Sequence, residues 1–303
     1  MKNLFLILFF SLISFFILPV QAAVYPMPEN SDLIGSLHVI TVEHGDTLSQ
    51  IAERFGITIH EMLAANRHLK NPNHLTVGST VVIPSFYILP KYRNGIVINL
   101  SELRLYYFDT ENHEIYTYPI SVGREGWRTP TTKTYIYKKE INPEWHVPKS
   151  IQQYMKETKG INLPDVVPSG PENPLGYRAM YLARWGYLIH GTNTPQYIGQ
   201  YISSGCVRMY NEDVEQLYNR VSVHTPVYII HHPDKVGVKN GKLYLEAHTP
   251  IHLDEKPSTL NHTAAEEIIR DAQANHISDD DIDWQKVHQI EVQKQGIPIM
   301  ISK

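Results

Sequence analysis

The chain contains a single cysteine, Cys206, in 303 residues, so it cannot form an internal disulfide. A fold of this length must therefore be held together by buried apolar side chains, and 42% hydrophobic residues are enough to build such cores. The same apolar content excludes a wholly disordered chain. The 27 basic and 31 acidic residues give a net charge of −4 without a basic block, so nucleic acid is not expected as a partner.

The first 22 residues have the pattern of a secretory signal peptide. Lys2 precedes an apolar run over residues 4–20, and the small residues Val20 and Ala22 favour cleavage after Ala22. An uncleaved membrane anchor is the alternative. Export would bring Cys206 into an oxidising compartment, where stable proteins usually keep their cysteines in disulfides. A lone thiol there calls for a chemical role, with a small buried hydrophobic residue as the alternative.

A compact unit is expected after a linker. Residues 23–37 contain prolines and little periodic pattern, so they are predicted to form that linker. Thr47 and Thr58 stand where helix N-caps are expected, each ahead of apolar residues at helical spacing. The elements predicted for residues 38–85 are strand 38–42, helices 48–55 and 59–66, and strand 78–84. This order predicts a small βααβ module.

The segments HVITVEHGDTLSQIAERFGITIHEMLAANRHL and LTVGSTVVIP resemble a LysM module, a small fold that binds glycans containing N-acetylglucosamine. The resemblance covers the whole unit. In that family the sugar groove lies between two loops, which implies glycan contacts at Asp46 and Thr47, next to Gly45, and around Asn66. Helix capping alone is the alternative role for Asp46 and Thr47. Some modules of this kind serve only as spacers.

The pattern becomes β-rich from residue 93 onward, with short apolar runs bounded by Asn, Gly and Pro. It predicts a mainly β, β-sandwich-like domain over residues 93–232. Residues 142–176 interrupt it with a long excursion that contains six prolines, and such segments are usually lids or binding walls. The remaining residues, 233–303, are predicted to form a small α+β subdomain with a hairpin turn at Asn240-Gly241, a strand 243–247, a helix 263–274 and a solvated acidic run 279–283.

The residues around the cysteine have the chemistry of acyl transfer. His190 ends an apolar strand and Gly191 follows it, while Gly205 and Arg208 flank Cys206. Free cysteine has a pKa of about 8.5 and attacks as the thiolate, so a histidine base is needed at neutral pH. The Gly205 and Cys206 amides can face an oxyanion, and Arg208 can bind a carboxylate. A core histidine, an inert thiol and a surface arginine are the alternatives. A zinc site needs three or four clustered ligands, so no metal is predicted.

His190-Gly-Thr-Asn, followed by Ser-Ser-Gly-Cys206-Val-Arg208, resembles the active-site signature of the bacterial L,D-transpeptidases, the cysteine enzymes of peptidoglycan cross-linking with a YkuD-type catalytic domain. The match spans about residues 95–232 and includes NGIVINLSELRLYYF and RTPTTKTYI. With the LysM-like unit in front, the order resembles the subgroup that joins an outer-membrane lipoprotein to peptidoglycan.

The resemblance implies a role for each matching residue. Cys206 would be the nucleophile and His190 the base and later the acid, with the Gly191 carbonyl orienting its imidazole and the Gly205 amide beside the oxyanion. Arg208 would bind the diaminopimelate carboxylates.

Two further positions of the signature, Asn193 and Ser204, are assigned to substrate binding. Many family members carry histidine where Ser204 stands, and this departure leaves His190 as the base.

The implied reaction is that of a periplasmic L,D-transpeptidase that acts on peptidoglycan stem tetrapeptides without a cofactor. A thioester forms at the L-centre of meso-diaminopimelate, D-alanine leaves, and an amine accepts the acyl group. The partners are stem peptides and glycan strands, with a lipoprotein lysine or a second diaminopimelate (a 3→3 cross-link) as acceptor. The alternatives are an L,D-carboxypeptidase that uses water, a cysteine endopeptidase, and a non-catalytic LysM wall-binding protein.

Overall fold

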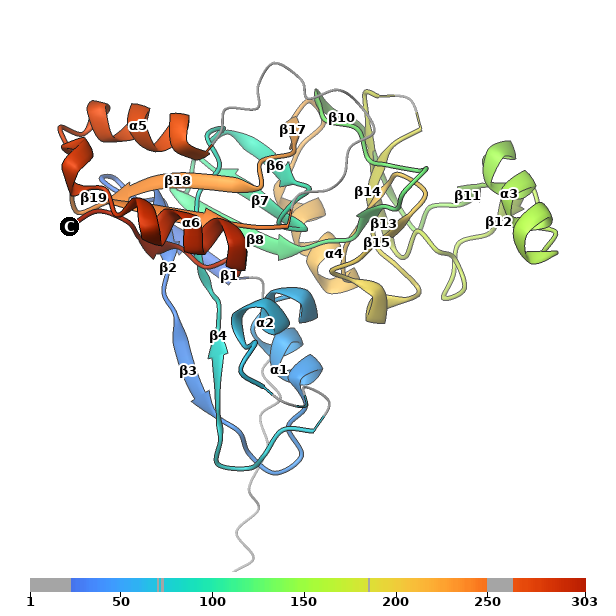
Figure 1. Cartoon of the computed structure of the whole chain (residues 1–303). Helices are drawn as coiled ribbons and strands as arrows, with labels where there is room; N and C mark the ends of the chain where they lie inside the picture. The colour runs from blue at the N-terminus through green and yellow to red at the C-terminus, as the bar shows by residue number, and fades with distance from the viewer. Residues whose placement is uncertain (1–22, 70, 72–73, 185, 250–263) are drawn as a thin grey trace, which may run out of the picture.

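The computed structural model describes residues 23–69, 71, 74–184, 186–249 and 264–303. The predicted signal peptide therefore lies outside the described residues. Three units are visible in Figure 1: a small module below, a β-rich domain behind and to the right, and a C-terminal subdomain at the left. Within the described ranges, every helix is too short or too polar to span a bilayer.

The small module has the predicted βααβ order. Its elements are β3 (His38–Thr41), α1 (Leu48–Arg54), α2 (Ile59–Ala65) and β4 (Thr80–Ile83). The Thr47 hydroxyl accepts a hydrogen bond from the Gln50 amide at the start of α1, and Thr58 forms a capping box with Glu61 at the start of α2. Both helices bury their apolar faces against the antiparallel β3–β4 pair, as the periodicity predicts.

The mainly β character of the second domain is confirmed. One mixed sheet has the order β1-β8-β7-β6-β17-β10-β13-β14-β16. Its strands are β1 (Ala23–Pro26), β8 (Glu114–Pro119), β7 (Arg104–Asp109), β6 (Gly95–Asn99), β17 (Pro226–Ile230), β10 (Thr132–Ile141), β13 (Arg178–Leu182), β14 (Leu188–His190) and β16 (Val207–Arg208). A two-stranded sheet of β9 (Val122–Gly123) and β15 (Tyr201–Ser203) lies beside it.

The long strand β10 gives this domain its sandwich-like form. Its first part pairs with β17 and its second part with β13, and the register shifts between Ile136 and Lys138. Ile98 and Leu105 from one half of the sheet lie in the same buried cluster as Met180 and Ile189 from the other. Helix α4 (Asn211–Arg220) contributes Val214 and Leu217 to that core.

The excursion carries more regular structure than a loop. It contains β11 (Trp145–His146), α3 (Lys149–Lys159) and β12 (Val166–Val167), and β11 pairs with β12. It projects to one side of the sheet at the right of Figure 1.

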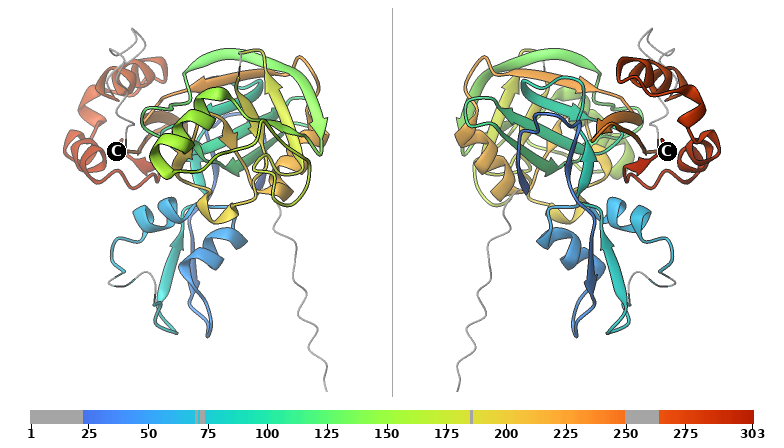
Figure 2. Two further views of the ribbon diagram at one scale, coloured as in Figure 1. Left: turned by 90° about the vertical axis from the view of Figure 1, so that its right-hand side faces the viewer. Right: turned by 90° about the vertical axis from the view of Figure 1, so that its left-hand side faces the viewer.

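The prediction that residues 23–37 form a linker is wrong for part of this segment, because two of its stretches are strands of two different sheets. Strand β1 pairs antiparallel with β8 at the edge of the large sheet. Strand β2 (Leu33–Gly35) pairs with β5 (Phe86–Ile88), the strand that follows the module. The segments that enter and leave the LysM-like module, β2 and β5, are thus paired with each other. Figure 2 shows the module and its connection to the rest of the chain from two sides. Strands this short show little alternation, and their partners lie far away in the sequence.

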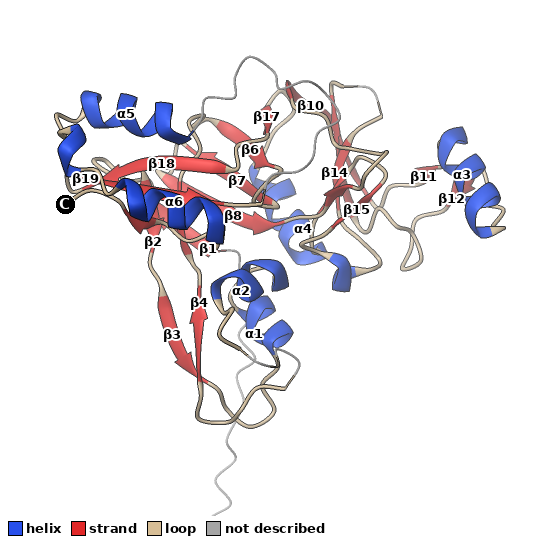
Figure 3. Cartoon of the chain, viewed as in Figure 1, coloured by secondary structure: helices blue, strands red, loops and turns tan. Residues whose placement is uncertain are grey.

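The C-terminal subdomain has the predicted α+β content. Strands β18 (Asp234–Lys239) and β19 (Lys242–Ala247) form a hairpin around the predicted Asn240-Gly241 turn, and β20 (Ile299–Met300) adds a third strand. Helices α5 (Ala264–Ala274) and α6 (Trp284–Gln293) flank these strands in Figure 3. Part of the acidic run is structural, since Asp279–Asp281 forms a 3-10 turn and Asp283 caps α6.

Candidate active site

The histidine of the signature ends strand β14, and the cysteine directly precedes the parallel neighbouring strand β16. In the β14–β16 pair, Ile189 faces Val207 and His190 faces Arg208. Ile189 and Val207 are buried in the core. Since side chains alternate along a strand, His190 and Arg208 point to the opposite face, and the charge of Arg208 acts on both His190 and Cys206. The sheet therefore brings together residues that are far apart in the sequence.

His190 is held in one orientation by the backbone. Its side chain is only 3% exposed, and Nδ1 lies 2.7 Å from the Gly191 carbonyl oxygen. A carbonyl only accepts, so Nδ1 carries the proton and Nε2 keeps its lone pair. Burial, and then the charge of Arg208, lower the pKa of His190 to about 3, although the Gly191 and Leu175 backbone groups oppose this shift. The imidazole is therefore neutral at physiological pH.

Cys206 is half-buried at the entry to β16. Its Sγ lies 3.7 Å from the Gly186 carbonyl oxygen. Burial raises the pKa of the thiol above its ordinary value, while a hydrogen bond with the Leu188 backbone and the charge of Arg208 act in the opposite direction. The free protein thus holds a neutral thiol and a neutral imidazole, each within the influence of the Arg208 charge.

Two guanidinium groups give the site positive charge. Arg208 is half-buried, and its Nε has no hydrogen-bond partner within the described residues. Burial lowers the pKa of Arg208, and the charge of Arg124 lowers it further. Arg124 also donates from Nη1 to Ser204 Oγ at 3.1 Å. The sequence reasoning did not select Arg124, which is distant from the signature in the chain. An anion at this site would be attracted by both arginines.

The backbone of the cysteine loop is fixed by internal hydrogen bonds. Ser203 Oγ accepts from the Gly205 amide at 3.1 Å and donates to the Cys206 carbonyl at 2.6 Å. Thr129 Oγ1 donates to the Gly205 carbonyl at 2.7 Å. Gly205 has a φ of +113°, which favours glycine. Because the Gly205 amide is already bonded, the structure argues against its predicted oxyanion role.

The two predicted substrate-binding positions make protein contacts. Ser204 receives the Arg124 hydrogen bond. Asn193 is exposed, and its Nδ2 donates to the Glu172 carbonyl at 3.0 Å. Asn193 therefore ties the histidine loop to the excursion, whose helix α3 also places the Tyr154 ring 4.7 Å from the Arg124 guanidinium.

Asn211, at the start of α4, clamps the histidine loop and was not predicted. Its Oδ1 accepts from the Thr192 amide at 3.1 Å, and its Nδ2 donates to the Thr192 carbonyl at 2.9 Å. A Cβ on Gly191 would come within 2.2 Å of Asn211 Oδ1, and one on Gly176 within 2.3 Å. These glycines allow the clamp to approach the loop.

In the LysM-like module, the three residues predicted to contact glycan have different surroundings. Thr47 is exposed and caps α1, while Asp46 accepts a hydrogen bond from the Glu43 amide at 2.9 Å. Asn66 is 2% exposed, and its amide bonds the backbone of Met62 and Val82. Asn66 therefore braces α2 against β4, which argues against direct sugar contact by its side chain.

One buried cluster outside this site has metal-ligating side chains. Ligand atoms of Glu102, Glu246 and His248 lie within 4.8 Å of one another. However, the Lys235 ammonium lies 2.7 Å from Glu102 and 3.0 Å from Glu246. Burial alone would raise the pKa of Glu102, but Lys235 beside it holds that pKa below its usual range. These residues form an internal ion network in which lysine supplies the positive charge.

The chain thus combines a βααβ module with a mainly β domain in which the histidine strand β14 pairs with the strand that follows the cysteine, the arrangement of a LysM-containing L,D-transpeptidase. The L,D-transpeptidase catalytic domain family, YkuD, matches residues 93–229, and the LysM domain family matches residues 40–84.

Full-length relatives carry the same assignment. The chain is 38% identical to the probable L,D-transpeptidase YcfS of Escherichia coli strain K12 over 80% of this chain and 78% of the relative. It is 36% identical to the probable L,D-transpeptidase ErfK/SrfK of Salmonella typhimurium over 97% of this chain and 95% of the relative. A solved L,D-transpeptidase from Mycobacterium smegmatis aligns at 17% identity and a TM-score of 0.37 over 51% of this chain and 64% of that one. The chain belongs to the L,D-transpeptidase family and is an L,D-transpeptidase enzyme.

Proposed function

We propose that this enzyme works through a thioester on Cys206 and that peptidoglycan stem tetrapeptides are its acyl donors. The observation that carries the proposal is the pairing of His190 on β14 with Arg208 on β16, directly after Cys206, so that the Arg208 charge acts on both the imidazole and the thiol. A non-catalytic wall-binding role gives no reason for a buried imidazole, a thiol and an unpaired guanidinium nitrogen to gather in one place.

His190 is the proposed base. With the Nδ1 proton donated to the Gly191 carbonyl, Nε2 is free to accept the thiol proton. Because both groups are neutral in the free protein, the proton moves as the sulfur attacks, rather than beforehand. The Gly191 carbonyl then stabilises the imidazolium through the same hydrogen bond.

Acylation follows from this arrangement. Cys206 Sγ bonds to the carbonyl carbon at the L-centre of meso-diaminopimelate, and the bond from that carbon to the D-alanine nitrogen breaks. His190 gives its proton to the leaving amine. The Cys206 amide is the proposed oxyanion donor, since the Gly205 amide is bonded to Ser203. Arg208, with Arg124 nearby, attracts the carboxylates of the donor.

The acceptor is an amine, which attacks the thioester carbon and returns the thiol. A lipoprotein lysine and the side-chain amine of a second diaminopimelate are the two acceptors proposed. The excursion supports an acceptor wall, because α3 contacts Arg124 and Asn193 bonds the Glu172 carbonyl. Transfer to water would make the enzyme an L,D-carboxypeptidase.

Mass spectrometry after incubation with a disaccharide tetrapeptide tests the nucleophile. The parent chain should gain the mass of the donor without D-alanine, and Cys206→Ala should gain nothing. His190→Ala should lose most of the adduct, whereas Ser204→Ala should keep it. An adduct on Cys206→Ala, or equal losses in the other two variants, would contradict the proposed roles.

Product analysis identifies the acceptor. Walls from cells with and without the protein are digested, and the muropeptides are separated. New 3→3 dimers indicate diaminopimelate as acceptor, peptide-bearing lipoprotein indicates lysine, and tripeptides alone indicate water. Cleaved cross-links without D-alanine release would instead indicate an endopeptidase.

We further propose that the protein is exported to the periplasm and that the LysM module holds it on glycan strands. The exposed Thr47 and the partly buried Asp46 beside it are the residues proposed to contact sugar. N-terminal sequencing of protein from a periplasmic extract should read from Ala23. Binding to purified sacculi should survive Cys206→Ala and weaken on deletion of residues 38–85.

A further inference from the structure

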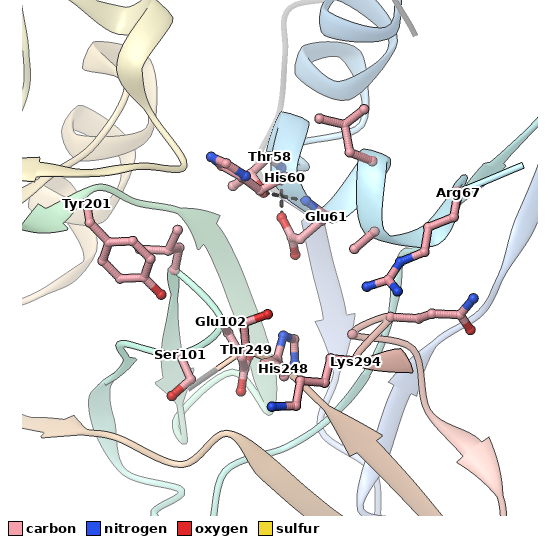
Figure 4. A pocket seen from close by; sticks show the side chains of 15 residues that line it. Thr58, His60, Glu61, Arg67, Ser101, Glu102, Tyr201, His248, Thr249 and Lys294 are labelled. Atoms are coloured by element: carbon pink, nitrogen blue, oxygen red, sulfur yellow. Dashed lines mark hydrogen bonds between the residues drawn. The ribbon is translucent and has the colours of Figure 1, made fainter. Parts of the chain in front are cut away.

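A pocket of about 370 Å³ lies where all three units meet. Helix α2 of the LysM module forms one wall, residues 101–103 and Tyr201 of the catalytic domain form the second, and residues 248–249 and 294–296 of the C-terminal subdomain form the third. Figure 4 shows side chains from all three units around the same opening. It is separate from the face that carries Cys206, and neither proposed glycan loop residue, Asp46 or Thr47, lines it.

The acidic residues of the pocket are already neutralised. Glu61 receives three hydrogen bonds from Arg104, at 2.7, 2.9 and 3.1 Å. Glu102 is paired with Lys235 at 2.7 Å. His248, the buried imidazole in the wall, bonds Glu246 at 2.6 Å. The pocket therefore offers little negative charge of its own.

Two basic side chains in the pocket wall have no such acidic partner within the described residues. Within the described residues, neither Arg67 nor Lys294 forms an ion pair, although the charge of Lys294 acts on Asp234 from a distance. Figure 4 shows Arg67 entering from the LysM side and Lys294 from the opposite, C-terminal side, with His60 further along the rim. Leu63 and Leu103 add apolar surface to the lining of the pocket.

We propose that this junction pocket binds a carboxylate-bearing stem peptide of peptidoglycan, as a second site distinct from the one at Cys206. That the ligand is a peptidoglycan stem peptide rests on the proposed function. That the ligand carries a carboxylate rests on the two basic side chains of the pocket. Arg67 and Lys294 bind the carboxylate from opposite walls, and the apolar surface receives the aliphatic part of the peptide.

The position of the pocket connects it to the catalytic site. Tyr201 lines the pocket and begins β15, which leads within three residues to Ser204 and then to Cys206. The Tyr201 hydroxyl donates to the Leu100 carbonyl at 3.0 Å. A peptide in the pocket therefore lies against β15, the strand that leads into the cysteine loop. Such a peptide also keeps the LysM module and the catalytic domain on the same fragment of peptidoglycan.

Calorimetric titration of full-length Cys206→Ala protein tests this site. The probe is the tripeptide L-Ala-γ-D-Glu-meso-diaminopimelate, compared with its fully amidated form and with a peptide-free oligomer of N-acetylglucosamine. The double variant R67Q/K294Q removes the pocket charges. The matched control, R54Q/K286Q, removes one arginine from the LysM module and one lysine from α6 outside the pocket.

The pocket variant should bind one tripeptide fewer than the control, or bind that tripeptide at least roughly tenfold more weakly, as loss of two charge-assisted hydrogen bonds implies. Amidation of the tripeptide should remove binding at the pocket of the Cys206→Ala protein as well, and should also weaken binding beside Arg208. Equal titrations of R67Q/K294Q and R54Q/K286Q would overturn the proposal, as would equal binding of the amidated peptide or a loss confined to the glycan oligomer. Because the titrated protein has no thiol, these results do not depend on whether Cys206 forms a thioester.

Discussion

Arg104 of the catalytic domain and Glu61 of the LysM module form an ion pair in which Nη2 lies 2.7 Å from Oε1 and 2.9 Å from Oε2. The arginine is fully buried. Its guanidinium also bonds Thr117 and lies 4.4 Å from the Tyr87 ring centre. Burial alone would lower the pKa of Arg104, but Glu61 beside it raises that pKa above its ordinary value. The module is thus fixed to the sheet by a desolvated charge pair.

Removal of Glu61 should therefore destabilise the chain. We expect Glu61→Ala to lower the free energy of unfolding by about 3–5 kcal/mol, because it leaves the Arg104 charge buried without a partner. Urea unfolding monitored by tryptophan fluorescence measures this loss. Glu53→Ala, on the exposed face of α1, is the matched control and should stay near the parent. Indistinguishable midpoints for the two variants would show that the pair does not hold the module.

Local signals account for the parts of the fold that the sequence predicts. The caps Thr47 and Thr58 act within three residues, so the βααβ module can be recognised from the chain alone. Strand β1 is different, because Ala23 pairs with Thr117 and only the tertiary fold brings them together. Asn66 lies where a sugar contact was predicted, yet the sequence does not indicate that its amide turns inward.

The same distinction holds at the active site. The chemistry of His190 and Cys206 is visible in the residue types and their glycine neighbours. The groups that hold them in place, Asn211 and Arg124, come from other elements, and an asparagine at a helix start gives no signal of what its side chain clamps. Support of this kind depends on three-dimensional packing rather than on local pattern.

Asn211 should act as a positioning residue. We expect Asn211→Ala to lower kcat about tenfold to a hundredfold with little change in KM, because the Thr192 loop that follows His190 loses both hydrogen bonds. Asn211→Asp should recover part of the rate, since it keeps the acceptor for the Thr192 amide. Single-turnover thioester formation measures the effect, with the exposed Asn219→Ala on the same helix as control. A change in KM alone would contradict a positioning role.

Gly205 should tolerate no side chain. Its φ of +113° disfavours other residues, and a Cβ would lie 2.8 Å from Tyr187 Cε1. We expect Gly205→Ala to cost about 1–3 kcal/mol and to slow acylation by moving Cys206. Gly126→Ala is the control, because Gly126 has a φ of +75° but open space around its Cβ position. Thermal unfolding and adduct formation should both separate the two variants, and equal losses in both would show that backbone strain alone is responsible.

The reactivity of the thiol should follow the raised pKa of Cys206. Burial favours the protonated form, so the thiolate becomes abundant only as the pH rises above the ordinary value of 9.0. We expect alkylation by iodoacetamide to be slow at neutral pH and to accelerate steadily into the alkaline range. Arg208→Gln should move this profile to still higher pH, because the arginine charge lowers the pKa of the thiol.

The control for that profile is Arg220→Gln. Arg220 ends α4, and its guanidinium stacks on the Tyr116 ring, so this substitution should leave the curve unchanged. His190 makes the experiment decisive. Its pKa of about 3 means that the imidazole is neutral throughout the neutral range and cannot stabilise a preformed thiolate by charge. An inflection below neutral pH in the parent, abolished by His190→Ala, would instead reveal a resting thiolate–imidazolium pair and contradict proton transfer during attack.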